Sequence, residues 1–344
     1  MRSARMHSLL AAVLLLLGGA HVARAASDGL QVYFIDVDGG QSTLFVTPAG
    51  KSLLIDTGWP GNDGLDAKRI AAAAKDAGVS KIDFVLLTHF HADHAGGVPE
   101  LVQQIPVGTF IDHGPNRETK GATEGYYEAY QKVLAGGHYG HIVAKPGEVL
   151  PVPGMKVLVI SADGQLIAHP VPGGGQPNAY CKDAETQPAD PSENARSLGV
   201  LITFGKLRIL DLGDLTWAKE MELMCPVNKL GKVDVLVVSH HGLFQSSSPA
   251  LVDAITPRVA IMNNGDKKGG SPPTFETLAK APGLETLWQL HFGNEAGKQN
   301  TATEYIANPT GPDAANYLKL TASPSGSFAV FNSRTGATKD YAAR

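Results

Sequence analysis

The chain has 344 residues, with 33 acidic and 29 basic side chains and a formal net charge of −4 at pH 7. This mildly acidic balance excludes the strongly basic surface of a nonspecific nucleic-acid binder, so nucleic acid is not a favoured partner. Its two cysteines, Cys181 and Cys225, are too few for a disulfide scaffold. One disulfide between them and two free thiols are both compatible with the sequence.

Residues 1–25 have the pattern of a secretory signal peptide. Two arginines in the first five residues precede the apolar run Leu9–Leu17, and Ala23–Ala25 has small residues where a signal peptidase can cut. The run is too short for a membrane anchor, which needs about 20 apolar residues. We therefore expect a periplasmic or secreted protein. Its mature chain, 26–344, is predicted to fold as a single domain, to have a net charge of −7 after loss of three arginines, and to hold no integral membrane segment.

Apolar patterns predict strands and helices that alternate along the chain. In the first half, strands are expected at Leu30–Ile35, Thr43–Val46, Ser52–Ile55 and Ile82–Leu87, with a helix at Leu65–Ala77 ended by Gly78. In the second half, strands are expected at Leu198–Phe204, Leu207–Leu210, Val233–Val238 and Phe328–Phe331, with a helix at Trp217–Met224. Residues 161–196, rich in Pro and Gly, indicate a long loop that is either functional or a solvated insertion. Two similar halves indicate two packed sheets with helices on their outer faces.

Three histidines and an aspartate follow the strand Ile82–Leu87 within six residues. His89 and His91 are two positions apart, so in extended chain their side chains point the same way and can share one cation. Asp93 and His94 follow as the chain turns into a Gly-rich bend, where they suit a second cation. Imidazole and carboxylate ligands together favour zinc or a similar transition metal over calcium or magnesium. The sequence therefore predicts a metal site at this strand end.

This segment resembles the H-x-H-x-D-H signature of the metallo-β-lactamase fold. Upstream, Leu53–Gly58 resembles the strand and turn that precede the signature in that superfamily. Downstream, Leu210–Leu215 resembles the strand ending in Gly-Asp, here with Asp214, and Val235–Gly242 resembles the strand ending in the last histidine ligand. The resemblance implies an α/β fold, a four-layer αββα sandwich, with two metal ions at one edge of the sheets.

A closer resemblance is to the hydrolase domain of ComEC-type competence proteins. Three elements carry it: the turn Asp36–Ser42, similar to D-V-G-Q-G-D-A; the Asn-x-x-Ser-Leu segment that begins at Asn194; and the pair His240-His241. The first turn departs from the pattern, with an extra Asp and a different order of Gly and Gln. Substrate contacts from this turn therefore cannot be transferred directly.

The resemblance implies a set of ligands for two Zn²⁺ or similar divalent ions. His89, His91 and Asp214 would hold the first ion, and Asp93, His94, Asp214 and one of His240 or His241 the second. Asp93 is also expected to orient the attacking water, and the histidine that is not a ligand to stabilise an oxyanion. Asp56 is expected behind a ligand histidine, where it would fix the tautomer.

The wider superfamily has a further histidine where this chain has Asn194. Asn194, Ser197 or water could complete the shell of the first ion, and an open position is what a catalytic metal requires. Other histidines could instead line the cleft: His113, His169 and His291, or the segment Gly137–His141, whose spacing fits poorly. Each of these is more simply explained as a residue outside the metal shell.

The predicted function is hydrolysis of a phosphodiester or phosphate ester by an exported di-zinc enzyme. Paired ions lower the pKa of a shared water and polarise the scissile group, so no Ser or Cys nucleophile is needed. The substrate choice rests on the ComEC-type resemblance, and a small-molecule or cell-envelope phosphoester is expected before nucleic acid. Two alternatives remain: a lactone, thioester or β-lactam hydrolase, and a metal-containing binding protein without catalysis.

Overall fold

The computed structural model describes residues 29–182, 184–311 and 315–344. Within them the chain forms two nine-stranded sheets and a small ribbon of β10 (Gln176–Pro177) with β13 (Val227–Asn228). No helix of these residues is long and apolar enough to cross a membrane. The predicted signal peptide, 1–25, lies outside the described residues, and the prediction that 26–344 form one domain stays a prediction.

The first sheet has the order β20-β19-β18-β1-β2-β3-β4-β5-β6. Its strands are β1 (Leu30–Phe34), β2 (Thr43–Val46), β3 (Ser52–Ile55), β4 (Ile82–Leu86), β5 (Val107–Asp112), β6 (Gly140–Val143), β18 (Leu318–Ala322), β19 (Phe328–Asn332) and β20 (Thr338–Tyr341). The strands β3 to β6 run parallel, whereas the pairs from β3 back through β1 to β20 are antiparallel. The parallel strands therefore end at a common edge.

The second sheet has the order β17-β16-β15-β14-β12-β11-β8-β7, with β9 beside β8. Its strands are β7 (Val149–Leu150), β8 (Lys156–Ala162), β9 (Gln165–Leu166), β11 (Gly199–Phe204), β12 (Leu207–Asp211), β14 (Val235–Val237), β15 (Val259–Met262), β16 (Thr286–His291) and β17 (Ile306–Asn308). From β12 to β17 the neighbours are parallel, so these strands also end at one edge. The predicted long loop, 161–196, is less irregular than expected, because it contains β9, β10 and two short 3-10 helices, Ala179–Cys181 and Glu193–Arg196.

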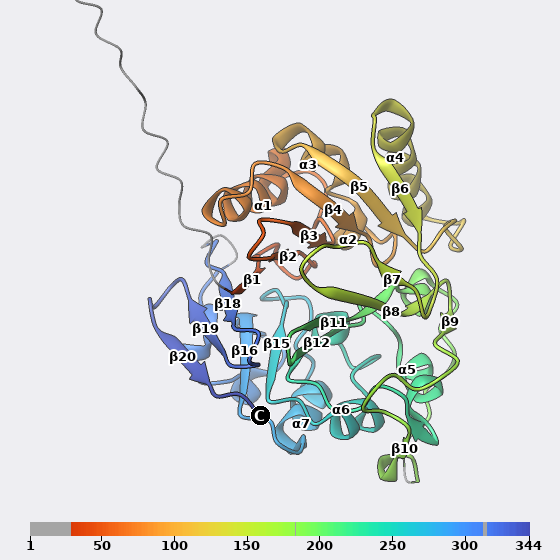
Figure 1. The fold of residues 1–344 in the computed structure, drawn as a ribbon, viewed down its shortest axis with the longest axis vertical. Coiled ribbons are helices and arrows are strands. Elements are labelled where there is room, and N and C mark those ends of the chain that lie inside the picture. The colour runs from red at the N-terminus through yellow and green to blue at the C-terminus, as the bar shows by residue number, and fades with distance from the viewer. Residues whose placement is uncertain (1–28, 183, 312–314) are drawn as a thin grey trace, which may run out of the picture.

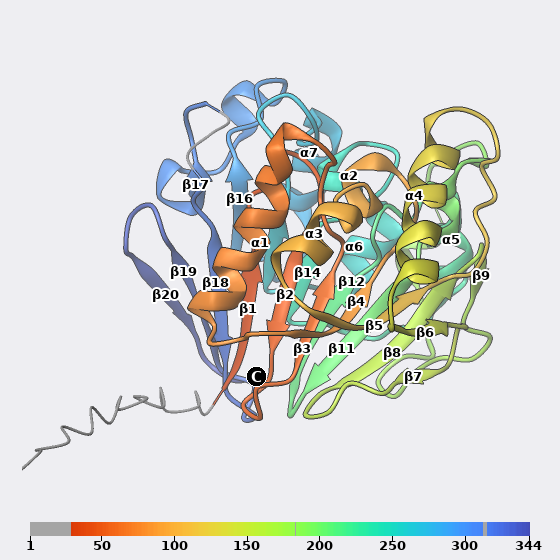
Figure 2. The ribbon, with the colours of Figure 1, turned by 90° about the horizontal axis from the view of Figure 1, so that it is seen from above.

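Helices cover the outer face of each sheet, so the chain is a four-layer αββα sandwich, as the sequence predicted (Figure 1). The first sheet carries α1 (Leu65–Asp76), α3 (Val98–Gln104) and α4 (Ala122–Gly136), and the second carries α5 (Trp217–Met224), α6 (Pro249–Ile255) and α7 (Pro272–Lys280). Figure 2 shows α1, α3 and α4 lying over the strands of the first sheet. The short α2 (Ala92–Ala95) follows β4 and carries part of the histidine cluster.

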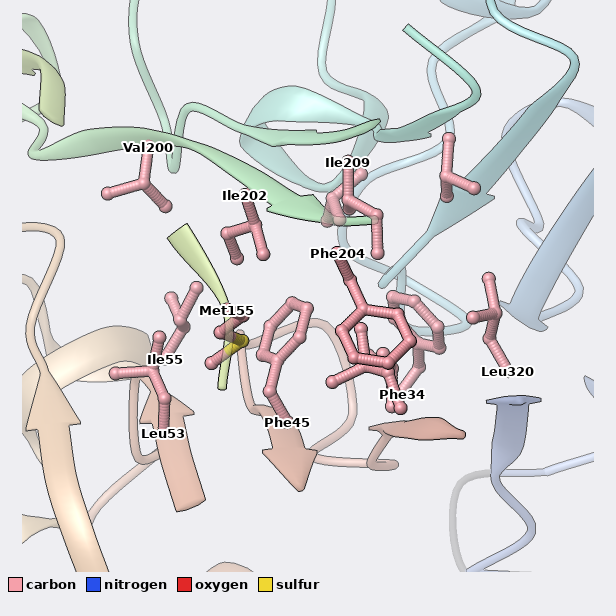
Figure 3. Close-up of a cluster of buried hydrophobic side chains, with 14 of the residues drawn as sticks. Phe34, Phe45, Leu53, Ile55, Met155, Val200, Ile202, Phe204, Ile209 and Leu320 are labelled. Atoms are coloured by element: carbon pink, nitrogen blue, oxygen red, sulfur yellow. The ribbon is translucent and has the colours of Figure 1, made fainter. Parts of the chain in front are cut away.

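Three apolar layers hold the sandwich together. Between the sheets, Phe34, Phe45 and Ile55 of the first face Ile202 and Ile209 of the second (Figure 3). Strand alternation divides the remaining side chains: Leu54 points to the layer under α1 and α3, while its neighbours Leu53 and Ile55 point between the sheets. A third layer packs Leu210 and Leu236 under α5 to α7. The strands are thus buried on both faces, which fixes the position of their ends.

Candidate metal centre

Three loops at the ends of strands from both sheets meet at one point. The segment after β4 carries His89 to His94, the loop after β12 carries Asp214, and the 3-10 turn after β14, Ser239–Gly242, carries His240 and His241. Because the carboxyl ends of parallel strands meet at one sheet edge, residues far apart in sequence are brought together here. The structure therefore gathers the histidine and aspartate motifs into one site.

The tightest part of the site consists of Asp93, His94, Asp214 and His241, whose ligand atoms all lie within 4.8 Å of one another. The Nε2 atom of His94 is 3.3 Å from Oδ2 of Asp214, and Nε2 of His241 is 3.0 Å from Oδ2 of Asp93. The two Nε2 atoms are 3.1 Å apart. All four side chains are buried.

The hydrogen bonds behind these two imidazoles define their tautomers. His94 donates from Nδ1 to Oδ2 of Asp56 at 2.7 Å, and His241 donates from Nδ1 to the carbonyl oxygen of Asn263 at 3.1 Å. Carbonyl and carboxylate oxygens only accept, so each neutral ring keeps its lone pair on Nε2. Two lone pairs and two carboxylates that converge in a buried space fit a divalent cation.

The charges of the site agree with this fit. Burial opposes ionisation of Asp214, but the adjacent His94, His241 and His240 hold its pKa well below the ordinary value. For His94, burial disfavours the charged ring, yet Asp214, Asp93 and Asp56 raise its pKa well above the ordinary value. Carboxylates here stay ionised and demand positive charge.

A second pair of imidazoles converges beside the first. Nε2 of His89 and Nδ1 of His91 face each other at 3.0 Å, and the same His89 atom is 3.9 Å from Oδ2 of Asp214. The hydroxyl of Thr88 gives its proton to Asp56 and accepts from Nδ1 of His89 at 3.1 Å. His91 donates from Nε2 to Glu118 at 3.1 Å. Both inward nitrogens therefore carry lone pairs, which again suits a cation.

The sequence predicted that only one of His240 and His241 binds metal, but in the structure both rings point to Asp214. Nε2 of each ring is 3.5 Å from Oδ2 of Asp214. The two residues have left-handed backbones, with φ of 55° and 53°, which turn both side chains toward the site. Such consecutive strained residues are costly and typical of functional sites.

The other residues that the sequence singled out surround this centre. Asn194 lies beside His240, with Nδ2 3.3 Å from its Nε2, and its buried Oδ1 has no partner among the described residues. Ser197 accepts a hydrogen bond from the backbone N–H of Asp214 at 3.2 Å. His113 bonds Glu193 at 2.9 Å rather than reaching the ligand cluster. Asp56 lies behind His94 and Thr88, in the place expected for a residue that orients ligands.

The remaining histidines with resolved partners bind carboxylates elsewhere. His141 contacts Asp112 at 2.8 Å, and His291 contacts Asp36 at 2.6 Å. These contacts pair each ring with a buried carboxylate that is not among the candidate ligands. They agree with the simpler explanation of these histidines as residues outside the metal shell.

Two residues of the site were missed by sequence reasoning. Glu118, in the connection before α4, holds His91, and Lys268, in the loop after β15, contacts Oδ2 of Asp93 and lies 4.9 Å from the ring centroid of Trp59. Both follow strand ends that border the site. Neither belongs to a spacing pattern, so only strand order could have indicated them.

The four-layer sandwich with a His-Asp cluster at its edge defines the metallo-β-lactamase fold. Residues 36–184, somewhat less than half of the chain, match the family model described as the metallo-beta-lactamase superfamily.

Relatives agree with this classification. The chain is 27% identical to Recombination protein 2 of Haemophilus influenzae over 68% of its own length and 24% of that protein, which supports the ComEC-type resemblance. It is 24% identical to a UPF0173 metal-dependent hydrolase of Cupriavidus metallidurans over 71% of its length and 77% of that protein. The chain thus spans about a quarter of Recombination protein 2. Among solved structures, a diphosphatase of the PhnP family aligns with a TM-score of 0.36 and 16% identity, covering 68% of this chain and 87% of the other.

Proposed function

We propose that this protein, a metal-dependent hydrolase, binds two zinc or similar divalent ions and cleaves phosphodiester or phosphate ester bonds. One observation carries the proposal: a single oxygen, Oδ2 of Asp214, lies within 3.3–3.9 Å of inward nitrogens from His89, His94, His240 and His241. That arrangement fits a carboxylate that bridges two cations.

His89, His91 and Asp214 would hold the proposed first ion, and Nε2 of His240 lies beside them, 3.5 Å from Oδ2 of Asp214. Asp93, His94, Asp214 and His241 would hold the proposed second ion. When bound, such ions lower the pKa of water and polarise a phosphoryl oxygen.

The protein's own groups position this chemistry. Asp56 fixes the tautomer of His94, and Glu118 does the same for His91. Asp93 is proposed to orient the attacking water as well as to bind metal. Asn194, with its unpaired Oδ1 next to His240, is proposed to contact either a ligand water or the substrate.

A phosphoester is preferred over a lactone, thioester or β-lactam for two reasons. The Asn-x-x-Ser-Leu and His-His-Gly elements resemble the ComEC-type subgroup, and the positive charge of Lys268 stands beside Asp93. An anionic substrate gains from that charge, whereas a neutral ester does not. The mildly acidic chain favours a small-molecule or envelope phosphoester over nucleic acid.

Export is part of the proposal. Cys181 and Cys225 form a disulfide in the structure, and disulfides persist mainly in oxidising compartments. Together with the signal-like pattern of residues 1–25, this supports a periplasmic or secreted location. Secretion would be tested by comparing the N-terminal residue of the protein from the periplasm and from the cytoplasm.

The proposed activity is tested with purified mature protein. Zinc is counted by elemental analysis, and turnover of bis-p-nitrophenyl phosphate is compared with that of a chromogenic β-lactam. We expect two zinc ions per chain and phosphodiester turnover that His91→Ala abolishes. His138→Ala, at an exposed histidine after α4, is the matched control and should retain activity.

Each alternative has its own outcome in this experiment. Turnover of the lactam without the phosphodiester would overturn the substrate assignment. Bound zinc without turnover of either substrate would favour a metal-binding protein without catalysis.

A further inference from the structure

The loop between β15 and α7 places a lysine at the opening of the metal centre. Lys268 contacts Oδ2 of Asp93, and its Nζ lies 4.9 Å from the centroid of the Trp59 ring. Its side chain is 31% exposed, whereas that of Asp93 is 9% exposed. Lys268 therefore connects the buried ligands with solvent.

The turn Asp38–Gly40 packs closely against the backbone and Cβ of Lys268. A Cβ atom on Gly39 would lie 2.9 Å from Cβ of Lys268 and 3.0 Å from the backbone nitrogen of Gly265. A Cβ on Gly40 would lie 2.7 Å from the backbone oxygen of Asp93. Because neither glycine has a side chain, the turn can pack against the loop that carries Lys268 on one side and against α2, which carries Asp93, on the other. This is the turn in which the sequence departs from the ComEC-type pattern.

The loop itself closes on a backbone hydrogen bond. The N–H of Gly265 donates to the carbonyl oxygen of Lys268 at 2.8 Å, so the backbone at the base of the lysine side chain is held in place. An ammonium has three donors, and Asp93 uses one of them. The face of Trp59 attracts the positive charge and leaves the other N–H groups for a stronger acceptor.

We propose that Lys268 binds a non-bridging oxygen of the substrate and makes the site selective for anionic esters. This inference rests on the proposed phosphoester hydrolysis and adds the residue that recognises the substrate's charge. A cation held by Asp93 would compete with Lys268 for the same carboxylate oxygen. The ammonium would then be available to an anion at the exposed end of the site.

The experiment compares two substrates with one leaving group. Bis-p-nitrophenyl phosphate carries a negative charge, and dimethyl p-nitrophenyl phosphate is neutral. For Lys268→Gln in the zinc-loaded protein we expect KM for the anion to rise about 10- to 100-fold, the range of a lost hydrogen bond to a charged group. The neutral ester still offers a phosphoryl oxygen but carries no negative charge, so its KM should rise less, by about 2- to 10-fold, the range of an ordinary hydrogen bond. Lys268→Arg should restore much of the affinity for the anion.

The adjacent Lys267 supplies the matched control, because its side chain is exposed and Lys267→Gln removes the same charge from the same loop. A direct measurement accompanies the kinetics: calorimetric titration of inorganic phosphate into zinc-loaded protein. Phosphate should bind more weakly to Lys268→Gln than to Lys267→Gln, with equal zinc contents.

Two results would overturn the inference. If Lys268→Gln raised KM equally for the charged and the neutral ester, or lowered the zinc content, the role of Lys268 would be to pair with Asp93 and not to bind the substrate. Unchanged phosphate affinity would also end it. A wild-type protein that cleaves no phosphodiester refutes the proposed function instead, and the phosphate titration still decides the role of Lys268.

Discussion

Single side chains behind the ligands decide which nitrogen each imidazole presents. His94 depends on Asp56, His241 on the carbonyl of Asn263, and His91 on Glu118. The first two supports are buried, whereas Glu118 belongs to a partly exposed loop. Burial opposes the charge of Glu118, but the bond from His91 and the N–H of Glu193 lower its pKa. The proposed first metal position is thus supported from a more accessible part of the chain than the second.

Replacing Glu118 with Gln tests this difference. The amide can still accept from Nε2 of His91, but it lacks the negative charge that strengthens the imidazole as a ligand. We expect one of two zinc ions to be lost at about tenfold lower chelator concentration, the lower end of effects from groups that orient ligands. Elemental analysis after dialysis against graded chelator measures this. Glu128→Gln, exposed on the neighbouring α4, is the control, and identical zinc retention in both variants would refute the expectation.

At the scale of elements, close backbone packing sets the position of α2, the short helix that carries Asp93 and His94. The N–H of Thr57 donates to the carbonyl of His94 at 2.7 Å, and the N–H of Gly97 donates to the carbonyl of Gly58 at 3.0 Å. A Cβ on Gly97 would lie 2.2 Å from the carbonyl oxygen of Thr57. The turn after β3 thus makes direct backbone contact both with His94 and with the residue that precedes α3.

Gly97→Ala should destabilise the protein although alanine suits the local backbone. The added methyl group must push apart two backbone segments, and overpacking of this kind costs about 1–3 kcal/mol. Urea denaturation measures the loss. Gly125→Ala, within α4 and with nothing within 4 Å of the added carbon, should instead be neutral or stabilise by up to about 1 kcal/mol. A Gly97→Ala protein as stable as wild type would contradict the close packing.

The contact between α5 and α6 carries a buried carboxyl group with a pH signature. Glu220 of α5 accepts the backbone N–H groups of Ser247 at 2.8 Å and Ser248 at 2.6 Å. Burial raises the pKa of Glu220 from 4.5 to about 7, although the N–H groups from Ser248 and Ser247 act in the opposite direction. The folded protein therefore holds this proton more tightly than the unfolded chain does.

Stability from Glu220 is therefore fully present below pH 4.5 and is lost as the pH rises through about 7. Glu220→Gln removes this dependence, so the difference in free energy of unfolding between wild type and variant should change between pH 5 and pH 8 by up to about 3 kcal/mol. Urea denaturation at both pH values measures it. Glu222→Gln, exposed on the same helix, should show no such change. A pH-independent difference for Glu220→Gln would refute the raised pKa.

For the molecule as a whole, the sequence predicted the sandwich, and the convergence of the histidine and aspartate motifs, better than it predicted the residues around them. Strands such as β3 and β4 could be recognised because they are short apolar runs followed by polar residues. The parallel strands β15 to β17 were not predicted, since a short buried strand cannot be told from a buried helix segment by its pattern.

The site shows the same division. His89 and His91 converge as their two-residue spacing predicted. Lys268 and Glu118 reach the site only through the packing of loops after β15 and β5, which no local pattern encodes. Likewise, the approach of both His240 and His241 to Asp214 depends on two left-handed residues that the letters His-His-Gly do not specify.

Because the proposed ligands come from both sheets, metal binding should stabilise the whole sandwich. Unfolding separates Asp214 of the second sheet from His89 and His94 of the first, so the native state binds the ions more tightly. The free energy of unfolding should then rise by about 1.4 kcal/mol for each tenfold increase in free zinc per bound ion. Thermal unfolding in zinc buffers measures this as a rising Tm. Asp214→Asn should flatten the response, whereas Asp340→Asn, exposed on β20, should not. If the Tm of the wild-type protein did not change with zinc concentration, the two sheets would hold these side chains together without a bound ion.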